Sequence, residues 1–219
     1  MHLDSKLLIF SKYPIPGEAK TRLIPALGSE GAAQLHRRMT EYITSIARST
    51  YVSSPESSDK VTVHYTGALL GDFRTWLGLD LQYKAQTAGN LGQRMQNAFK
   101  VTLEHGTIAA IGIGTDVPDL SSEILQQAHE SLSNHDIVLG PAADGGYYLI
   151  GMKSLYPELF ANIDWGTEHV YGQTREIASH LGLRVAELPM LSDIDRPEDL
   201  STLTDDPRFC DIIEKGRQL

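Results

Sequence analysis

Residues 6–23, KLLIFSKYPIPGEAKTRL, join a short apolar run to a stiff segment that ends in basic side chains. The run at 6–10 predicts a buried β-strand because it is brief, apolar and contains a β-branched residue. Pro14, Pro16 and Gly17 then keep the chain irregular. A strand that leads through such a loop into a helix is the repeating unit of an α/β protein.

The residues after this loop have the pattern of a helix with one buried face. Within 29–50, apolar side chains recur every three or four positions, at Leu35, Met39, Tyr42, Ile43 and Ile46. Similar spacing occurs in 91–104, 121–133 and 168–181. Each of these stretches is therefore predicted to be a helix that packs on the rest of the molecule.

Apolar runs like the first one alternate with these helices, at 61–66, 79–86, 107–114, 136–142, 147–152 and 183–188. The alternation predicts an α/β fold: a three-layer α/β/α sandwich with a mostly parallel central sheet. Right-handed crossovers place most loops that follow strands along one edge of that sheet. Ligands of such folds bind at this edge, so function is expected there.

The chain is expected to form one domain over residues 1–219. Its length of 219 residues suffices for a sizeable core. Residues 51–60, YVSSPESSDK, are the most linker-like segment, but the strands predicted on both sides of them are expected to belong to one sheet. This segment is therefore predicted to be an exposed loop and not a boundary between domains.

The composition limits the partners. The 19 basic and 28 acidic residues give a net charge of −9, which argues against nucleic acid or an anionic membrane as a partner. It leaves room for a small anion in a local basic pocket. No apolar stretch is long enough to span a bilayer, and the first is too short for a signal peptide. A cytoplasmic location is expected, and a homodimer is left open.

The loop after the first predicted strand is the first of four segments expected to meet at the sheet edge. Lys20 and Arg22 are suited to phosphate oxygens, Arg through paired contacts and Lys as a point charge. Gly17 would let a ligand approach the backbone closely. The alternative is a solvated loop with two ordinary surface charges.

The second segment is IGIGTDVPDL, residues 111–120, in which Asp116 follows an apolar strand. A carboxylate at the carboxyl end of a strand is a natural ligand for Mg²⁺ or Mn²⁺ beside phosphates. The alternative is that Asp116 only stabilises the turn before Pro118. We favour the metal role.

The third segment is GPAADGGYYLIGM, residues 140–152. Asp144 with Gly145 and Gly146 predicts a hairpin turn, since Asp-Gly is a strong hairpin signal. The two glycines also leave room for a ligand against the backbone, and Asp144 could then accept hydrogen bonds from hydroxyl groups. The two interpretations are compatible.

The fourth segment is LSDIDRPEDL, residues 191–200. Asp195 with Glu198 three residues later has the form of a capping box, so Asp195 could be structural. Asp193 has no such role. Two carboxylates beside Asp116 are reasonable mainly if a divalent cation offsets their repulsion.

A further stretch, QTAGNLGQRMQNAF at 86–99, places Gly89, Asn90 and Gly92 where a strand meets a helix, with Arg94 in the first turns. The free N–H groups of a helix start suit an anion. A tight turn with Asn90 as N-cap explains the same letters almost as well.

Motifs of other phosphate-binding and hydrolytic enzymes are absent from the sequence. It contains no G-x-x-x-x-G-K-[ST], no G-x-G-x-x-G after the first strand, no G-x-S-x-G and no H-E-x-x-H. His36, His105, His129 and His135 fall on predicted helices or helix ends and are expected to be solvated. His169 is the one histidine expected near the candidate pocket.

These segments, in this order, resemble the nucleotide-diphospho-sugar transferase superfamily, whose fold is of the GT-A type. They are most similar to its small bacterial "transferase 1" branch, which is glycosyltransferase-like and linked to arsenosugar biosynthesis. The likeness covers nearly the whole chain and is carried by KYPIPGEAKTRL (12–23), NLGQRM (90–95), IGTDVPDL (113–120), GPAADGGYYLIG (140–151), IDWGTEHV (163–170) and LSDIDRPEDL (191–200).

The resemblance implies a set of roles for residues of this chain. The implied catalytic residues are Lys20, Arg22, Asp116 and Asp144. The implied nucleotide-binding residues are Phe10, Lys12, Pro16, Gly17, Lys20, Arg22, Asn90, Gly92, Arg94 and Thr115. The implied sugar- or acceptor-binding residues are Asp144, Gly145, Gly146, Tyr147, Trp165 and Thr167. A divalent cation, Mg²⁺ or Mn²⁺, is implied at Asp116 with Asp193 or Asp195.

The implied activity is that of a metal-dependent glycosyltransferase that moves a sugar from a nucleotide-diphospho-sugar to a small-molecule acceptor. One alternative is a nucleotidylyltransferase that activates a phosphorylated small molecule with a nucleoside triphosphate. A second is a protein that binds a nucleotide sugar without turnover. Nucleotidyl transfer would need a further basic group for the acceptor phosphate; Arg94 is the only clear candidate, which favours glycosyl transfer.

The sequence departs from the family pattern at two places. Members often carry Asp where this chain has Asn90, which removes one carboxylate. Asp116 stands in T-D-V-P and not in a full D-x-D, so the metal site would have to be completed from the distant segment that contains Asp193 and Asp195.

Overall fold

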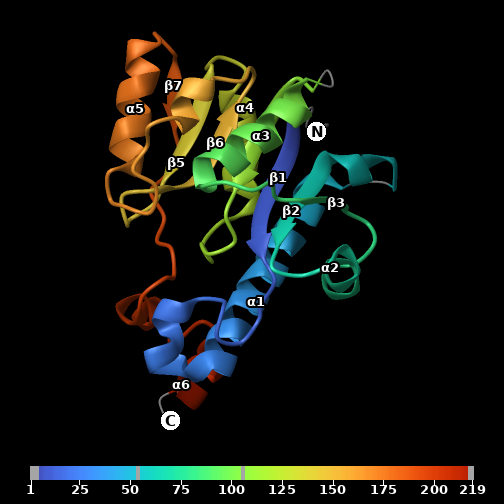
Figure 1. The fold of residues 1–219 in the computed structure, drawn as a ribbon, viewed down its shortest axis with the longest axis vertical. Helices are drawn as coiled ribbons and strands as arrows, with labels where there is room; N and C mark the ends of the chain where they lie inside the picture. The colour runs from blue at the N-terminus through green and yellow to red at the C-terminus, as the bar shows by residue number, and fades with distance from the viewer. Residues whose placement is uncertain (1–4, 53–54, 105–106, 217–219) are drawn as a thin grey trace.

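The computed structural model describes residues 5–52, 55–104 and 107–216, and the chain runs through them as one layered α/β unit (Figure 1). His105, predicted to be solvated, and residues 53–54 of the predicted loop lie outside the described residues. The rest of the loop predicted at 51–60 is partly helical. Helix α1 ends at Tyr51, and a 3-10 helix, η2, spans Pro55–Lys60.

The strands form one sheet in the order β3-β2-β1-β4-β6-β5-β7. All neighbouring strands are parallel except at β6, which is antiparallel to both β4 and β5. The predicted mostly parallel sheet is therefore confirmed. The strand bounds are β1 Ser5–Lys12, β2 Val61–Thr66, β3 Gln82–Ala85, β4 Ala109–Ile113, β5 Ile137–Pro141, β6 Tyr147–Met152 and β7 Val185–Glu187.

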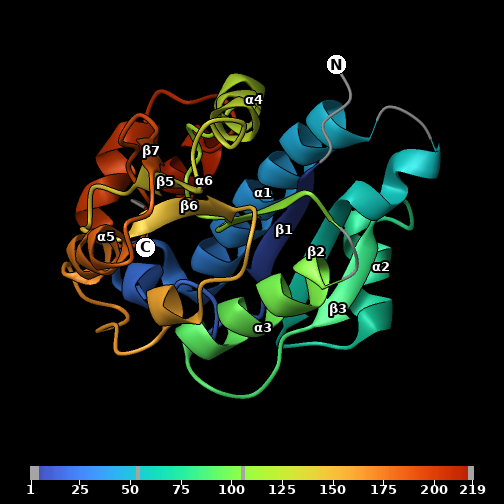
Figure 2. The same cartoon turned by 90° about the horizontal axis from the view of Figure 1, so that it is seen from above.

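Helices cover both faces of the sheet, as Figure 2 shows for α1 and α3 on opposite sides of β1. The α-helices are α1 Ile24–Tyr51, α2 Leu70–Leu77, α3 Leu91–Leu103, α4 Ser122–Ser131, α5 Val170–His180 and α6 Cys210–Gly216. The remaining 3-10 helices are η1 Thr21–Leu23, η3 Pro157–Phe160 and η4 Pro197–Leu203. Helix α1 starts earlier than the predicted residue 29 because it continues across a kink at Gly28, where φ is 67°.

The alternation of side chains along β1 separates the two cores. Leu7 and Ile9 face a cluster shared with α1, α2 and α4, whereas Leu8 faces a cluster shared with α3 and α5. Phe73 in the first cluster and Phe99 in the second are fully buried. Burial of one such side chain contributes about 1.5–3 kcal/mol. This is the three-layer sandwich predicted from the sequence.

A third apolar cluster lies beyond the sheet, where the N-terminal half of α1 meets η4 and α6 (Figure 1). Leu35 of α1, Phe209 and Ile194 are buried in it. Ile194 also donates its backbone N–H to the carbonyl oxygen of Asp116 over 2.9 Å. The cluster therefore fixes the segment that carries Asp193 and Asp195 against the loop after β4.

Among the described residues, no helix combines the length and the apolar character that a membrane crossing requires.

Candidate functional site

The main cavity, of about 360 Å³, opens at the edge of the sheet where β1 and β4 end and β6 begins. Strand β6 runs antiparallel, so its first residue, Tyr147, lies at the same edge as the last residues of its neighbours. The predicted hairpin between β5 and β6 is present: Ala142 N–H donates to Gly146 O over 3.0 Å. The convergence of strand-end loops expected from the sequence is therefore what the structure has.

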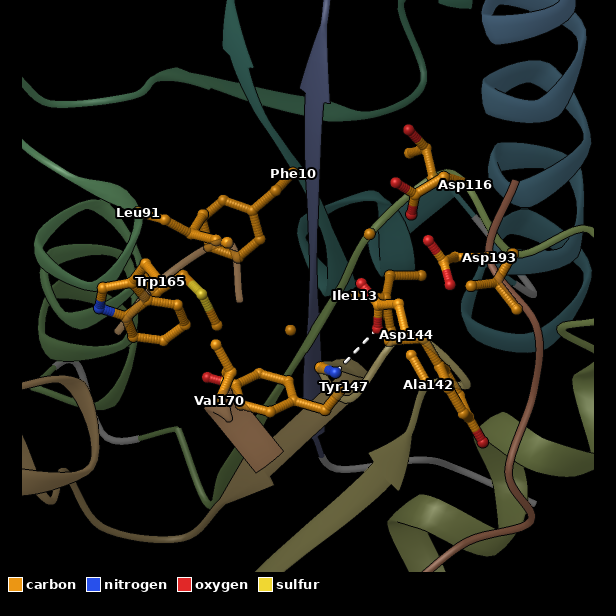
Figure 3. A pocket seen from close by; sticks show the side chains of 18 of the residues that line it. Phe10, Leu91, Ile113, Asp116, Ala142, Asp144, Tyr147, Trp165, Val170 and Asp193 are labelled. Atoms are coloured by element: carbon orange, nitrogen blue, oxygen red, sulfur yellow. Dashed lines mark hydrogen bonds between the residues drawn. The ribbon is translucent and has the colours of Figure 1, made fainter. Parts of the chain in front are cut away.

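Three carboxylates from separate loops line this cavity (Figure 3). Asp116 comes from the loop after β4, Asp144 from the hairpin before β6, and Asp193 from the segment after β7. Asp144 Oδ1 accepts the backbone N–H of Gly146 over 2.8 Å. Its other oxygen has no hydrogen-bond partner within the described residues, so it is available to a ligand.

The three carboxylates are not equivalent. Burial, followed by the nearby charges of Asp144 and Asp116, raises the pKa of Asp193 to about 6. Burial also acts to raise the pKa of Asp116, but the charge and hydrogen bond of Lys20 outweigh it and hold that pKa below its ordinary value. Lys20 therefore compensates the burial of Asp116, whereas its smaller effect on Asp193 does not.

The cations of the first loop lie against these carboxylates. Lys20 Nζ donates to Asp116 Oδ2 over 3.2 Å and lies 3.6 Å from Asp195 Oδ1. Arg22 donates to the other oxygen of Asp195. The Lys20 side chain is only 7 % exposed, whereas that of Arg22 is 60 % exposed. Asp195 is thus paired with two cations. Asp193, and not Asp195, lines the main cavity.

Lys20 adopts an uncommon backbone conformation, with φ 47° and ψ 47°. The left-handed region costs a residue with a side chain about 1–2 kcal/mol. Strain of this kind is found where the surrounding structure holds a side chain in place for a purpose. Here it directs the Lys20 ammonium into the carboxylate cluster.

The other predicted residues of the first loop shape it. Ile15 O accepts the N–H groups of Glu18 and Ala19 over 3.0 Å each, which closes a turn around Pro16 and Gly17. Gly17 has a φ of 82° and does not line the cavity. Lys12 does line it, and its ammonium lies 3.2 Å from Glu18 Oε2.

The predicted anion site at the start of α3 has mainly structural contacts. Asn90 accepts the N–H of Gln93 over 2.9 Å and caps the helix. Arg94 Nε donates to Gly89 O over 2.8 Å. A Cβ on Gly92 would lie 2.4 Å from Trp165 Nε1, so the indole packs in the space that the missing side chain of Gly92 leaves open. These contacts fit the turn-and-cap alternative, and the role of Asn90, Gly92 and Arg94 in nucleotide binding stays a prediction.

The apolar side of the cavity includes side chains that the sequence did not assign. It is formed by Phe10, Leu91, Met95, Tyr147, Trp165 and Val170, called here the apolar wall. Figure 3 shows Phe10, Leu91 and Trp165 across the cavity from Asp116, Asp144 and Asp193. Thr115, which is buried, and Thr167 also line the cavity, as expected of a site there.

Gly145 has a packing role beside its predicted one. Its φ is 89°, and a Cβ there would lie 2.3 Å from the carbonyl oxygen of Glu168. The Gly145 carbonyl accepts the N–H of Tyr171 over 2.9 Å. The glycine thus lets the 163–170 loop, which carries Trp165 and Thr167, lie against the hairpin that carries Asp144.

His36 is a cavity residue that sequence reasoning missed. The prediction of a solvated side chain was wrong, because His36 is 7 % exposed and lines the cavity. Its Nε2 donates to Lys12 O over 2.8 Å, which leaves Nδ1 as an acceptor without a partner in the described part of the chain. Burial lowers its pKa. The position seven residues before Ile43 on the same helix face was the available signal.

Two other histidines are also less solvated than expected. His129 and His135 are both of intermediate burial. His129 Nδ1 lies 2.9 Å from the hydroxyl of Ser5, and His135 Nδ1 lies 2.9 Å from the carbonyl oxygen of Ser131. Both lie at the end of α4, where a contact with β1 shields His129 and a local contact shields His135.

A second, polar cavity of about 360 Å³ adjoins the first and shares Asp144, Thr167 and Asp193 with it. Arg22, Asp195, Arg196 and His169 also line it. The expectation that His169 lies near the pocket is therefore confirmed. The two cavities together form one cleft with the carboxylates at their junction.

The comparisons with known proteins agree with this arrangement. A protein from Desulfovibrio desulfuricans G20, provisionally named a nucleotide-diphospho-sugar transferase, has a crystal structure that matches with a TM-score of 0.82 and 30% identity, over 99% of both chains. The chain thus has the GT-A type of fold, and the predicted resemblance is confirmed. More narrowly, it belongs to the family described as "Uncharacterized protein conserved in bacteria (DUF2064)", whose model matches residues 54–167.

More distant structures share the fold alone. A CMP:2-keto-3-deoxy-manno-octonic acid synthetase in complex with CTP matches with a TM-score of 0.57 and 9% identity, over 91% of this chain and 96% of that one. A cytidylyltransferase from Leptospira borgpetersenii serovar Hardjo-bovis matches with a TM-score of 0.55 and 16% identity, over 97% and 93%. No curated protein matches the sequence significantly.

Proposed function

We propose that the protein is a transferase with a nucleotide-activated donor, and more specifically a metal-dependent glycosyltransferase that uses a nucleotide-diphospho-sugar. The observation that carries the proposal is the pairing of Lys20 with Asp116, a carboxylate that opens onto the cavity. Cations suited to a diphosphate thus lie next to carboxylates suited to a divalent cation and to a hydroxyl. The names of the structural neighbours support the same class.

The donor diphosphate is assigned to the first loop. Lys20 supplies a buried point charge and Arg22 an exposed guanidinium that can contact two oxygens. In this structure, Lys20 forms ion pairs with Asp116 and Asp195, and Arg22 forms one with Asp195. Binding of the diphosphate would replace part of these ion pairs with charge-assisted hydrogen bonds, each worth about 1.5–3 kcal/mol.

A divalent cation is assigned to Asp116 and Asp193. Their oxygens are the ligand type that Mg²⁺ and Mn²⁺ prefer. Burial first, and then the charges of Asp144 and Asp116, raise the pKa of Asp193, and a cation would relieve both effects. Among the described residues, no group of three or more His, Cys, Asp or Glu side chains is arranged to hold a metal ion by itself. This fits a cation held by one or two carboxylates together with substrate phosphates.

The residues of the chain then have distinct roles in sugar transfer. The acceptor oxygen forms a bond to the anomeric carbon, the bond from that carbon to the diphosphate oxygen breaks, and the nucleoside diphosphate leaves with the electron pair. Asp144 takes the hydroxyl proton through its unpartnered oxygen. Lys20 and Arg22 stabilise the charge that develops on the diphosphate. A bound divalent cation would supply further neutralisation of that charge.

A thermal-shift panel tests this function. The purified protein is mixed with nucleoside diphosphate sugars and with nucleoside triphosphates, each with and without Mn²⁺. Because a ligand of the native state raises the melting temperature by mass action, the donor should raise it only when metal is supplied. We expect the shift with a sugar nucleotide. A shift with triphosphates alone would instead favour nucleotidyl transfer, and donor binding without product release would favour a binding protein.

A further inference from the structure

We propose that the apolar wall is the acceptor subsite, and that it binds the flat, uncharged part of an alcohol whose hydroxyl reaches Asp144. This inference rests on the proposed function, because it assigns the second substrate of the same transfer. It predicts that the acceptor is neither a phosphate ester nor a simple polyol. Four features of the cleft support it.

The first feature is the placement of the cations. Lys12 is the only Lys or Arg among the described residues that line the main cavity, and its ammonium is held by Glu18 at 3.2 Å. Lys20 instead contacts Asp116 and Asp195, and Arg22 contacts Asp195, away from the apolar wall. Arg94, the candidate partner for an acceptor phosphate, is hydrogen-bonded to Gly89 and Gln86. A phosphate on the acceptor would therefore find no cation in this cavity apart from Lys12, which is paired with Glu18, and the divalent cation assigned to the donor diphosphate.

The second feature is apolar surface that the protein leaves open. Leu91, at the first position of α3, is 44 % exposed, although Met95 one turn later is buried. Both side chains line the cavity, and Figure 3 shows Leu91 beside Phe10 and Trp165. A ligand that covers these side chains removes apolar surface from water, which favours binding.

The third feature is the fixed orientation of Trp165. Gly92 leaves the space for its indole, since a Cβ there would lie 2.4 Å from Nε1. Tyr147 packs edge-on to it, with ring centroids 6.2 Å apart and an interplanar angle of 81°. The ring is therefore held as a flat surface before any ligand arrives, so little order is lost on binding.

The fourth feature is the lack of polar atoms on this wall. Trp165 Nε1 and Tyr147 Oη are both buried without a hydrogen-bond partner among the described residues, and Figure 3 shows the indole nitrogen directed away from the cavity. Phe10, Leu91 and Met95 offer only carbon and sulfur atoms. A nucleobase would leave the hydrogen-bonding groups of its edge unmatched here, which is costly. An aryl or similarly flat apolar group has no such groups to satisfy.

The arrangement connects this subsite to the chemistry of transfer. The wall and the carboxylates are opposite sides of one cavity, so a short alcohol can contact both at once. Its oxygen bonds to the anomeric carbon, its proton passes to Asp144, and the nucleoside diphosphate leaves with the electrons of the broken bond. No further reactant is required.

Intrinsic fluorescence tests the subsite directly. The chain has two tryptophans, so Trp76→Phe leaves Trp165 as the only one. In this variant we would titrate 2-phenylethanol, 2-phenylethyl phosphate and glycerol, with Mn²⁺ and a saturating nucleoside diphosphate. We expect 2-phenylethanol to change the Trp165 emission with a dissociation constant at least tenfold lower than that of its phosphate ester. Glycerol should have no effect.

Two leucine variants provide a matched pair. Leu91→Ala in the Trp76→Phe background should weaken the binding of 2-phenylethanol at least fivefold. Leu79→Ala should not weaken it, because Leu79 is 80 % exposed and lies outside both cavities. Tighter binding of the phosphate ester, or equal effects of the two variants, would overturn the proposal. So would displacement of 2-phenylethanol by a free nucleoside, which would assign the wall to the base.

Failure of this inference and failure of the proposed function are distinguishable. Leu91→Ala should leave the metal-dependent thermal shift by the donor unchanged, because the donor diphosphate is assigned to the first loop. If a sugar nucleotide raises the melting temperature but 2-phenylethanol leaves Trp165 unaffected, the acceptor assignment is wrong and the donor assignment stands. If no sugar nucleotide produces a shift, the proposed function itself is wrong.

Discussion

The two sides of the cleft are built in opposite ways. On the charged side, carboxylates from three distant loops face one another, and burial with their repulsion raises the pKa of Asp193 to about 6. On the apolar side, Trp165 is held by packing against Gly92 and Tyr147, with no charge involved. On the charged side, the carboxylates thus repel one another until a ligand relieves the repulsion. On the apolar side, Trp165 already has a fixed orientation before a ligand binds. The difference indicates that donor and cation binding change the first side more than the second.

On the charged side, we expect substitutions in the first loop to cause the largest loss of donor binding. In the double variant Lys20→Ala with Arg22→Ala, we expect donor binding to weaken by several kcal/mol, at about 1.5–3 kcal/mol for each charge-assisted hydrogen bond lost. Isothermal titration calorimetry with the donor and Mn²⁺ measures this. Lys100→Ala, an exposed lysine on α3, is the control. Wild-type affinity in the double variant would reduce the first loop to a stiff surface loop.

The apolar side should be sensitive to acid through His64. This buried side chain stacks on Phe10 with ring centroids 5.2 Å apart, and burial lowers its pKa from 6.5 to about 4. The unfolded state binds the proton more readily. The contribution of neutral His64 to the free energy of unfolding is therefore fully present above pH 6.5 and is lost as the pH falls toward 4. The shift corresponds to roughly 3 kcal/mol.

Urea unfolding at pH 7 and pH 4.5 measures that loss. The wild type should lose more stability than His64→Leu, which cannot titrate at this position. An equal loss in both proteins would mean that His64 is accessible to protons in the folded state.

The charged side should show the opposite pH dependence at Asp193. Its folded pKa of about 6 is above its ordinary value of 3.8, so the folded state binds the proton more readily. Stability contributed by the protonated form is present below pH 4 and is lost as the pH rises through 6. Asp193→Asn should therefore be more stable than the wild type at pH 8, by about 1–2 kcal/mol after allowance for solvent screening.

The same variant sharpens the comparison between stability and function. Asp193→Asn should lose metal-dependent donor binding while it gains stability, and thermal unfolding with and without the donor measures both. Ser192→Ala, at the exposed neighbouring residue, is the control. A variant that is destabilised at pH 8 would contradict the repulsion that we infer.

Gly92→Ala should have the smallest effect on donor binding and a selective effect on the apolar wall. The added Cβ would lie 2.5 Å from the Phe160 carbonyl oxygen and 2.4 Å from the indole nitrogen, so both Trp165 and the backbone at Phe160 must shift. We expect a changed Trp165 emission in the Trp76→Phe background, with donor affinity within about twofold. Gly172→Ala, where a Cβ meets nothing within 4 Å, is the matched control.

Much of this could be predicted from the sequence, because it depends on local patterns. Strand-and-helix alternation predicted the layered fold, and the rule that ligands bind at strand ends predicted that Asp116, Asp144 and Asp193 meet. The contact of Lys20 with Asp116 spans 96 positions and follows from the pairing of β1 with β4, since the two residues lie in the loops after these strands. No local pattern encodes such a distance.

The errors have a common origin in reading residues by type. His36 was treated as a typical surface histidine, although its helix face made it a cavity residue. The packing of Trp165 against Gly92 was also missed, while the assignment of Gly92 to nucleotide binding stays a prediction. The rest of the apolar wall, Leu91, Met95 and Val170, was missed because these side chains have no chemical signature apart from their place in the fold.

The central claim is that Asp116 takes part in holding a donor nucleotide and a divalent cation beside Lys20. The most direct test is calorimetric titration of the sugar nucleotide found by thermal shift, with and without Mn²⁺, into the wild type and Asp116→Asn. We predict that the wild type binds at least tenfold more tightly with Mn²⁺, and that Asp116→Asn folds normally but shows no gain from the metal. Equal affinity in all four titrations would contradict the account.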